Sequence, residues 1–322
     1  MTPRSQAPPI KGDGSLYDPG PSLSRRGAVG RLGRRSKKAL SPLLLMLPAL
    51  ALLAWMMAVP AGEAVRLSFT HWDGFSAPHS IGFANFTELL RDHRFKEAVV
   101  HNLLIVAAMP IWIALPYGVA WGLHREIPGW RFFRLAFFLP VVFSPVVMGI
   151  YYGIVLQPGG PFNGLLGTLG LGALRAEWLN DPSLALPVVI AIIIWATFGI
   201  GVLIFLAGFA NLDDEQVAAA KIDGASSWQI QRHVIFWQLL PMIEFWAVVI
   251  VIASFTAFFP LIYTLTHGGP GYSTYTVDFY LYTEAFSNAR LGYASAIGVG
   301  EVVIIAVLAA VVIGVLRWRR RS

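Results

Sequence analysis

The sequence predicts an all-α transmembrane protein that crosses the bilayer six times. Of its 322 residues, 56% are hydrophobic and only 13% are charged, a balance that water-soluble domains of this length rarely show. The aromatic fraction is 13%, as expected where rings anchor at the two surfaces of a bilayer. Cysteine is absent, which excludes disulfides, cysteine metal ligands and cysteine nucleophiles.

A helix needs about 20 mostly apolar residues to span a bilayer, and stretches of that size with few or no charges recur along the chain. We expect spanning helices at about residues 40–60, 100–123, 135–156, 185–210, 242–263 and 291–316. This arrangement leaves six basic residues outside, namely Arg66, Arg91, Arg94, Lys96, Arg175 and Arg290. The other 18 of the 24 lie inside. Because an excess of Lys and Arg marks the cytoplasmic side, both termini are predicted to be cytoplasmic.

The first apolar stretch has an alternative interpretation as a cleaved signal peptide. Basic residues from Arg25 to Lys38 precede it, and Ala61 and Ala64 resemble a cleavage site. The basic region is too long for a signal peptide, and the apolar run is longer than a typical one. We therefore favour a spanning helix.

Three parts are expected along the chain. Residues 1–38 are rich in Pro, Gly, Ser and Arg, which predicts a disordered basic cytoplasmic tail that lies against anionic lipid headgroups. Residues 39–317 form the transmembrane domain, and residues 318–322 form a short basic cytoplasmic end. The longer connections of the domain are external at about 64–98, 157–183 and 264–290, and internal at 211–241.

Two of the external connections are expected to be folded. The segment from Phe83 to Val99 has the pattern of one amphipathic helix, with its apolar side formed by Phe86, Leu89, Leu90 and Phe95. The connection at 157–183 is rich in glycine and ends in Trp178-Leu179-Asn180-Asp181-Pro182. This pattern indicates a folded loop and not a linker.

The internal connection at 211–241 has signals for two helices joined by a tight turn. Asp213 can cap a helix that runs to Ile222, and Gly224 can end it, because glycine accepts the left-handed conformation. Ser226 followed by Gln229 is a capping-box pattern that starts a second helix. Pro241 can open the next span, where a missing N–H is harmless.

The segment EQVAAAKIDGAS, from Glu215 to Ser226, resembles the signature cytoplasmic loop of binding-protein-dependent ABC importer permeases. In that family the short helix of the loop seats in a cleft on the ATP-hydrolysing subunit and transmits its closure. The resemblance assigns this coupling role to Glu215, Ala219, Ala220, Asp223, Gly224, Ala225 and Ser226. Ala218 stands where the family has a glutamate, so that acidic contact is lost or is supplied by Glu215.

A second motif, Leu265-Thr266-His267-Gly268-Gly269-Pro270, resembles an external loop of the carbohydrate branch of this family. That branch includes permeases for maltose-type oligosaccharides and for glycerol-3-phosphate. The residues of this external motif are Thr266, Gly268, Gly269 and Pro270. Over residues 40–317 the resemblance implies a six-helix type I ABC importer permease domain in a bacterial or archaeal cytoplasmic membrane.

The resemblance also implies partners. They are a second, homologous permease in a heterodimer, two ATPase subunits that hold ATP and Mg, and an external solute-binding protein. This chain has no Gly-Lys dipeptide, so it lacks the phosphate-binding loop and is expected to be a transport subunit without a cofactor, not an enzyme. It has no catalytic or metal-binding motif, and no basic face interleaved with aromatics that would indicate nucleic acid.

Recognition of a sugar needs aromatic faces and well-placed hydrogen-bonding groups. Candidates for the translocation path are Tyr151 and Tyr152 in the third span, Ser254, Thr256 and Tyr263 in the fifth, and Ser295 in the sixth. Taken alone, each of these residue types more often serves packing or anchors a helix at an interface. Glu301 in the sixth span is a further candidate, because an ionisable group in a span is costly; its alternative role is a carboxylate bonded to a Ser or Thr.

Two other classes of function compete with the importer. An ion-coupled secondary transporter would use Glu301 as its coupling carboxylate. A polytopic membrane enzyme would need carboxylates or histidines clustered at one face, and the seven histidines are scattered along the sequence. The resemblance favours import of an oligosaccharide or a related polyol, including glycerol-phosphate compounds.

Overall fold

A computed structural model describes residues 29–125 and 129–321 of the chain. It consists of two units, residues 1–60 and 61–322, each described by itself. The first unit contains most of α1 (Val29–Leu67), so this helix begins before the expected boundary near residue 39. Its large apolar side chains Leu47, Trp55 and Met57 are exposed, as a lipid-facing helix requires. Most of the tail predicted at 1–38 lies outside the described residues.

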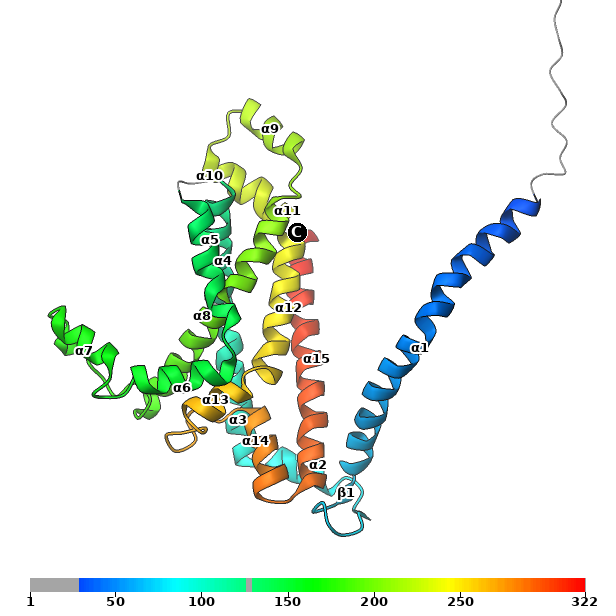
Figure 1. Cartoon of the computed structure of the whole chain (residues 1–322), viewed down its shortest axis with the longest axis vertical. Coiled ribbons are helices and arrows are strands. Elements are labelled where there is room, and N and C mark those ends of the chain that lie inside the picture. The colour runs from blue at the N-terminus through cyan, green and yellow to red at the C-terminus, as the bar shows by residue number, and fades with distance from the viewer. Residues whose placement is uncertain (1–28, 126–128, 322) are drawn as a thin grey trace, which may run out of the picture. The chain divides into compact units, whose positions relative to one another are not determined.

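The second unit is built almost wholly from helices (Figure 1). They are α2 (Ala84–Arg91), α3 (His93–Ala107), α4 (Met109–His124), α5 (Trp130–Phe138), α6 (Pro145–Val155), α7 (Pro161–Thr168), α8 (Pro182–Phe209), α9 (Asp214–Ile222), α10 (Ser227–Ile230), α11 (Phe236–Gln238), α12 (Leu240–Thr256), α13 (Phe259–Leu265), α14 (Val277–Tyr282) and α15 (Leu291–Arg321). Short 3-10 helices are η2 (Leu139–Val142) and η3 (Gly172–Leu174), and π-helical segments are η4 (Gln231–Ile235) and η5 (Thr283–Ser287). Strands β1 (Thr70–His71) and β2 (His79–Ser80) pair antiparallel, with Thr70 opposite Ser80.

The described residues include four helices long and apolar enough to cross a membrane, at 46–67, 93–124, 182–209 and 291–318. Two bent helix pairs also qualify, at 132–155 with a bend of 98° and at 227–256 with a bend of 63°. If each pair is one span, the total is six. The predicted all-α transmembrane class is therefore confirmed.

Two predicted spans are broken where a straight helix was expected. The span at 135–156 breaks before Pro145, because the ring of a proline pushes the preceding residue, Ser144, into an extended conformation (ψ 141°). The span at 242–263 ends at Thr256, and α13 starts two residues after Ala257 with Pro260 in its first turn. Both prolines stand inside apolar runs, whose hydropathy does not reveal the break.

Buried tryptophans join the long helices of the second unit. Trp112 of α4 donates from Nε1 to the Thr197 hydroxyl of α8 at 2.7 Å, and Trp246 of α12 donates to the carbonyl of Trp112 at 3.2 Å. Helices α6 and α13 pack against each other closely at Gly149, where an added Cβ would lie 1.9 Å from the Thr264 hydroxyl oxygen. In Figure 1, α9 and the C-terminal end of α15 lie at one end of this unit, and α2 and α14 lie at the other.

The external connection at 157–183 is folded, as predicted. Asn163 holds it together, because its side-chain Nδ2 donates to the carbonyl of Ala176 at 2.9 Å and its Oδ1 accepts from the indole of Trp178 at 2.9 Å. Helix α7 and the 3-10 turn η3 belong to this loop.

Candidate functional site

The internal connection forms the helix and turn that the sequence indicates. Asp213 caps α9, because its Oδ1 accepts the backbone N–H of Glu215 at 3.0 Å and its Oδ2 accepts the side-chain amide of Gln216 at 2.8 Å. The helix ends at Ile222, and Gly224 follows with a φ of +81°. The left-handed residue that the turn requires is therefore the predicted glycine.

The second helix of this connection starts at the predicted capping box. The backbone N–H of Ser226 donates to Oε1 of Gln229 at 2.7 Å, and the backbone N–H of Gln229 donates to the Ser226 hydroxyl at 3.4 Å. Pro241 lies in the first turn of α12, also as predicted. All of these bonds are local, so the two caps do not depend on the rest of the molecule.

The residues to which the coupling role was assigned are accessible. Glu215, Ala219, Asp223, Gly224 and Ser226 are exposed, whereas Ala220 and Ala225 are partly buried. No residue of α9 is buried, and its apolar Ile222 is 87% exposed. The coupling residues and this apolar side chain are therefore open to contact with another protein.

Few contacts connect α9 to the spans. The side-chain amide of Gln238 in α11 accepts from the backbone N–H of Asp213 at 2.9 Å and donates to Gln216 at 3.3 Å. Residues 227–238 form one helix that ends with α11, and earlier in this helix the Gln231 amide donates to the Tyr117 hydroxyl of α4 at 2.5 Å. A displacement of α9 therefore reaches the spans through the helix 227–238.

Two of the predicted path residues line a cavity in the spans. Tyr152 stacks edge-on against Tyr151, with 5.3 Å between ring centroids, and against Trp195 of α8, with 5.6 Å. With Phe143 and Met148 these rings surround a cavity of about 320 Å³. Sequence reasoning missed Trp195, whose signal is an indole in the middle of an otherwise aliphatic span.

The structure does not bring the remaining path candidates to this cavity. The hydroxyls of Ser254, Thr256 and Ser295 each donate to the carbonyl four residues earlier in their own helix, at 2.7, 3.0 and 2.8 Å. Such back-bonding occupies a hydroxyl within its helix. Tyr263 belongs to a separate aromatic group with Phe259 and other rings of α13 and α14.

Glu301 is buried in α15, with 8% of its surface exposed. One of its carboxylate oxygens has no hydrogen-bond partner among the described residues, so the alternative role as a carboxylate bonded to a Ser or Thr is not seen for that oxygen. The carboxyl group of Asp278 in α14 lies nearby. Burial raises the pKa of Asp278 to about 6, against the opposing effect of hydrogen bonds from Thr276 and the backbone.

Asn102, which the sequence analysis did not single out, connects three helices. It is fully buried in α3; its Nδ2 donates to the carbonyl of Ser254, and its Oδ1 accepts the backbone N–H of Val277 at 2.9 Å. The carbonyl belongs to the last turn of α12 and the N–H to the first turn of α14, where backbone groups lack helical partners. One amide therefore joins α3 to the end of α12, next to the break, and to the start of α14.

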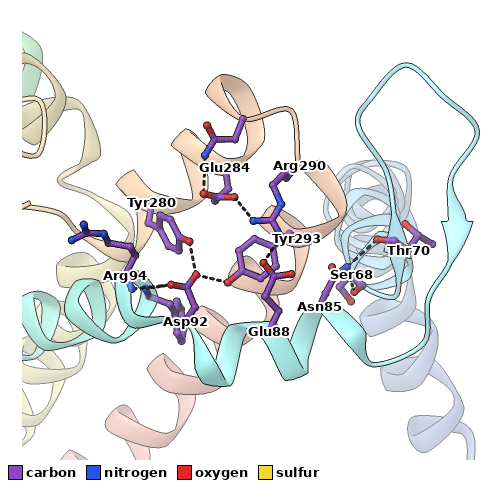
Figure 2. Close-up of polar contacts among 12 residues, drawn as sticks. Ser68, Thr70, Asn85, Glu88, Asp92, Arg94, Tyr280, Glu284, Arg290 and Tyr293 are labelled. Carbon is purple, nitrogen blue, oxygen red and sulfur yellow. Dashed lines mark hydrogen bonds and ion pairs between the residues drawn. The ribbon is translucent and has the colours of Figure 1, made fainter.

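The external end carries a network of charged and phenolic side chains (Figure 2). Arg290 forms ion pairs with Glu88 of α2 and with Glu284 of η5, the latter at 3.0 Å, and its guanidinium lies 4.3 Å from the ring centre of Tyr293. Glu284 is 5% exposed, so its charge depends on Arg290. An open cavity of about 890 Å³ lies beside this network.

Asp92 is the second centre of the external network. One carboxylate oxygen caps α3, and the other accepts the hydroxyls of Tyr280 and Tyr293, the latter at 2.6 Å. Burial acts to raise the pKa of Asp92, but these hydroxyls and the backbone N–H groups outweigh it and hold the pKa below its usual range. The prediction of a single helix from Phe83 to Val99 is wrong, because Asp92 divides this segment into α2 and α3. Leu90, which was predicted on the apolar side of that helix, is 73% exposed.

The external motif forms a tight loop against an aromatic ring. Gly268 has a φ of +77°, and a Cβ there would lie 2.6 Å from the ring of Tyr275. The hydroxyls of Thr266 and Thr274 are 2.7 Å apart, and Thr274 donates to the carbonyl of Gly269 at 2.8 Å. Pro270 follows after a cis peptide bond. Glycine is thus favoured at position 268 both by the positive φ and by the lack of space for a Cβ next to Tyr275.

An all-α bundle with broken spans, an exposed capped helix at one end and a polar network at the other is the architecture of a polytopic membrane protein. Residues 81–321 match the family described as binding-protein-dependent transport system inner membrane component, and the chain belongs to this family. It is therefore an inner-membrane permease subunit of an ABC importer. Family membership supports this prediction and not the ion-coupled alternative.

Relatives and a solved structure agree with this assignment. A diacetylchitobiose uptake system permease of Streptomyces coelicolor is 30% identical over 276 residues, which are 82% of this chain and 78% of the relative. An sn-glycerol-3-phosphate transport system permease of Brucella abortus is 30% identical over 263 residues, 79% and 87% of the two chains. A bacterial ABC transporter involved in import of the acidic polysaccharide alginate shares the fold, with a TM-score of 0.74 at 23% identity over 89% of this chain and 98% of that one.

Proposed function

We propose that this permease imports a sugar or a related polyol, including glycerol-phosphate compounds, delivered by an external solute-binding protein. It pairs with a second, homologous permease and with two ATPase subunits, which hold ATP and Mg. The names of the relatives, one for diacetylchitobiose and one for sn-glycerol-3-phosphate, support this class of solute. The observation that carries the proposal is the exposed, self-capped helix α9.

In this proposal α9 docks on an ATPase subunit through Glu215 and Ile222. Binding of ATP closes the ATPase pair and moves the connection at 213–235 as one body, because its caps are internal. The contacts of Gln238 with Gln216 pass the motion to the helix 227–238. The spans then open toward the binding protein, and the solute is released inward when the ATPase pair reopens.

The cavity at Tyr151, Tyr152 and Trp195 is the proposed point of contact with the solute. Aromatic faces pack against the C–H faces of a sugar ring, while phenolic hydroxyls exchange hydrogen bonds with its hydroxyls. Glu301 is proposed to face the pathway, because a buried carboxylate oxygen without a partner is otherwise costly.

The Gly224→Val variant tests the coupling role. A β-branched residue resists positive φ, so the turn after α9 is expected to break. Reconstituted uptake should fall severalfold, or the ATPase subunits should be lost on purification, while membrane insertion survives. Gly224→Asn is the matched control, because asparagine tolerates the left-handed region, and it should transport well. Normal uptake and normal ATPase association in Gly224→Val would refute the role of this connection.

A further inference from the structure

A second cavity lies at the internal end of the spans, beside the coupling connection. Its volume is about 550 Å³, and its walls include the rings of Tyr117, Trp228 and Trp237. Gln231, Arg232 and His233 supply its polar lining. Most of these residues belong to the helix 227–238, which is bent by 63° from the span that follows. The predicted topology places this helix at the cytoplasmic surface of the bilayer, where tryptophan is enriched.

The polar side of this cavity has unused bonding capacity. Gln231 is 4% exposed; its amide nitrogen is bonded to Tyr117, but its Oε1 has no partner among the described residues. Arg232 is exposed and makes no ion pair within the described part of the chain. The Nδ1 of His233 lies 3.0 Å from the carbonyl of Gln229. A buried acceptor therefore lies beside a cation and an imidazole, in a cavity with aromatic walls.

We propose that this cavity binds the headgroup of an anionic phospholipid of the cytoplasmic leaflet, such as phosphatidylglycerol. Arg232 and His233 contact the phosphodiester, and a headgroup hydroxyl donates to Oε1 of Gln231. The rings of Trp228 and Trp237 pack against the glycerol backbone and the first methylenes of the acyl chains. The cytoplasmic leaflet attracts basic residues through its anionic lipids, which favours this occupant over a neutral lipid.

Occupancy of the cavity bears on coupling, a consequence that rests on the proposed function. The bond from Gln231 to Tyr117 forms the floor of the cavity and is a direct link between the helix 227–238 and α4. A headgroup bonded to the same Gln231 side chain holds that link in place. ATP-driven transport is therefore expected to depend on anionic lipid, through this site.

The test uses the whole importer, with its partner permease and ATPase subunits, in nanodiscs of phosphatidylcholine with or without phosphatidylglycerol. Native mass spectrometry should show retained phosphatidylglycerol, and the ATPase rate should rise as this lipid is titrated. The double variant Arg232→Gln with His233→Gln should weaken both responses about tenfold, since each basic contact near an anionic surface contributes. Arg134→Gln, an exposed cation of α5 outside the cavity, is the control and should behave like the wild type.

Three results would overturn the proposal. Equal lipid retention in the double variant and the wild type would show that the cavity is not the site. Recovery of the ATPase rate by dimethyl phosphate, a soluble phosphodiester that is not a proposed solute, in pure phosphatidylcholine would identify a soluble phosphate ligand. Loss of ATPase subunits from the double variant would identify a protein interface. Retained phosphatidylglycerol in an importer that takes up no sugar or polyol would instead refute the proposed function and leave this site standing.

Discussion

The external and internal ends of the second unit are held together in opposite ways. At the external end, Arg290 pairs with Glu88 and Asp92 bonds to Tyr293, in each case across about 200 residues of sequence. At the internal end, the caps at Asp213 and Ser226 join residues two or three positions apart. Long-range bonds fix helices relative to one another, whereas local caps fix only the shape of a segment.

The two ends are therefore expected to differ in role: the external end fixes the positions of helices, and the internal end moves as a segment. The external network is expected to contribute mainly to stability, because its loss frees whole helices and leaves buried charge. Helix α9 of the coupling connection is expected to contribute little to stability, because none of its residues is buried, and its loss should appear in transport. The following changes test that separation, beginning with the largest expected loss of stability.

Replacement of Asn102 by leucine should cause the largest loss. The carbonyl of Ser254 and the backbone N–H of Val277 would both be buried without partners, which lowers the free energy of unfolding by about 3 kcal/mol. Thermal unfolding of the purified complex measures the effect. Asn180→Leu, at an exposed external position, is the control. Equal melting temperatures for the two variants would mean that Asn102 does not hold the break after α12.

The next largest loss is expected for Arg290→Gln. This change leaves the buried Glu284 without its cation, at a cost of about 2 kcal/mol after allowance for the partial exposure of Arg290. Arg91→Gln removes an exposed external arginine that makes no ion pair among the described residues, and should be nearly neutral. A melting temperature for Arg290→Gln as high as that of Arg91→Gln would show that this network does not stabilise the external end.

Asp92 should make stability depend on pH. Because its pKa is lower in the folded protein than in the unfolded chain, its stabilisation is present above the unfolded value of about 4 and is lost as the pH falls below it. Melting temperatures recorded from about pH 5 to about pH 3 should fall less steeply for Asp92→Asn than for the wild type. Parallel curves would show that Asp92 contributes no pH dependence.

The smallest change in stability is expected for Glu301→Gln, which keeps the size of the side chain and removes its charge. If Glu301 faces the pathway, the variant should alter substrate affinity or the coupling of basal ATPase activity. Uptake and binding-protein-stimulated ATPase activity in proteoliposomes measure both. Wild-type values in the two assays would show that Glu301 does not face the pathway.

The same division explains what the sequence could predict. Asp213, Gly224 and Ser226 act on neighbours within a few positions, so their roles could be inferred from spacing alone. The bond between Arg290 and Glu88 could not, because nothing local indicates a partner 202 positions away. Asp92 was placed inside a helix because the flanking apolar periodicity continues through it, although its side chain prefers to cap α3.

The broken spans and the cavity show a further limit. Pro145 and Pro260 were visible, but apolar runs around them satisfied the length of a span, and the break depends on partners such as Asn102. Tyr151 and Tyr152 were predicted as path residues, and in the structure they line a cavity together with Trp195 from another helix. Which aromatic residues meet across helices depends on packing angles that composition does not contain.

The internal capping of α9 has a consequence beyond a single transporter. Every side-chain cap of the segment from Asp213 to Gln229 comes from the segment itself, and the bonds of Gln238 to Asp213 and Gln216 tie this segment to the helix that follows. Under the proposed function, choice of ATPase and choice of solute then reside in different parts of one chain. A cell that keeps one ATPase for several importers would then need this short segment and its contacts with Gln238 in common among their permeases.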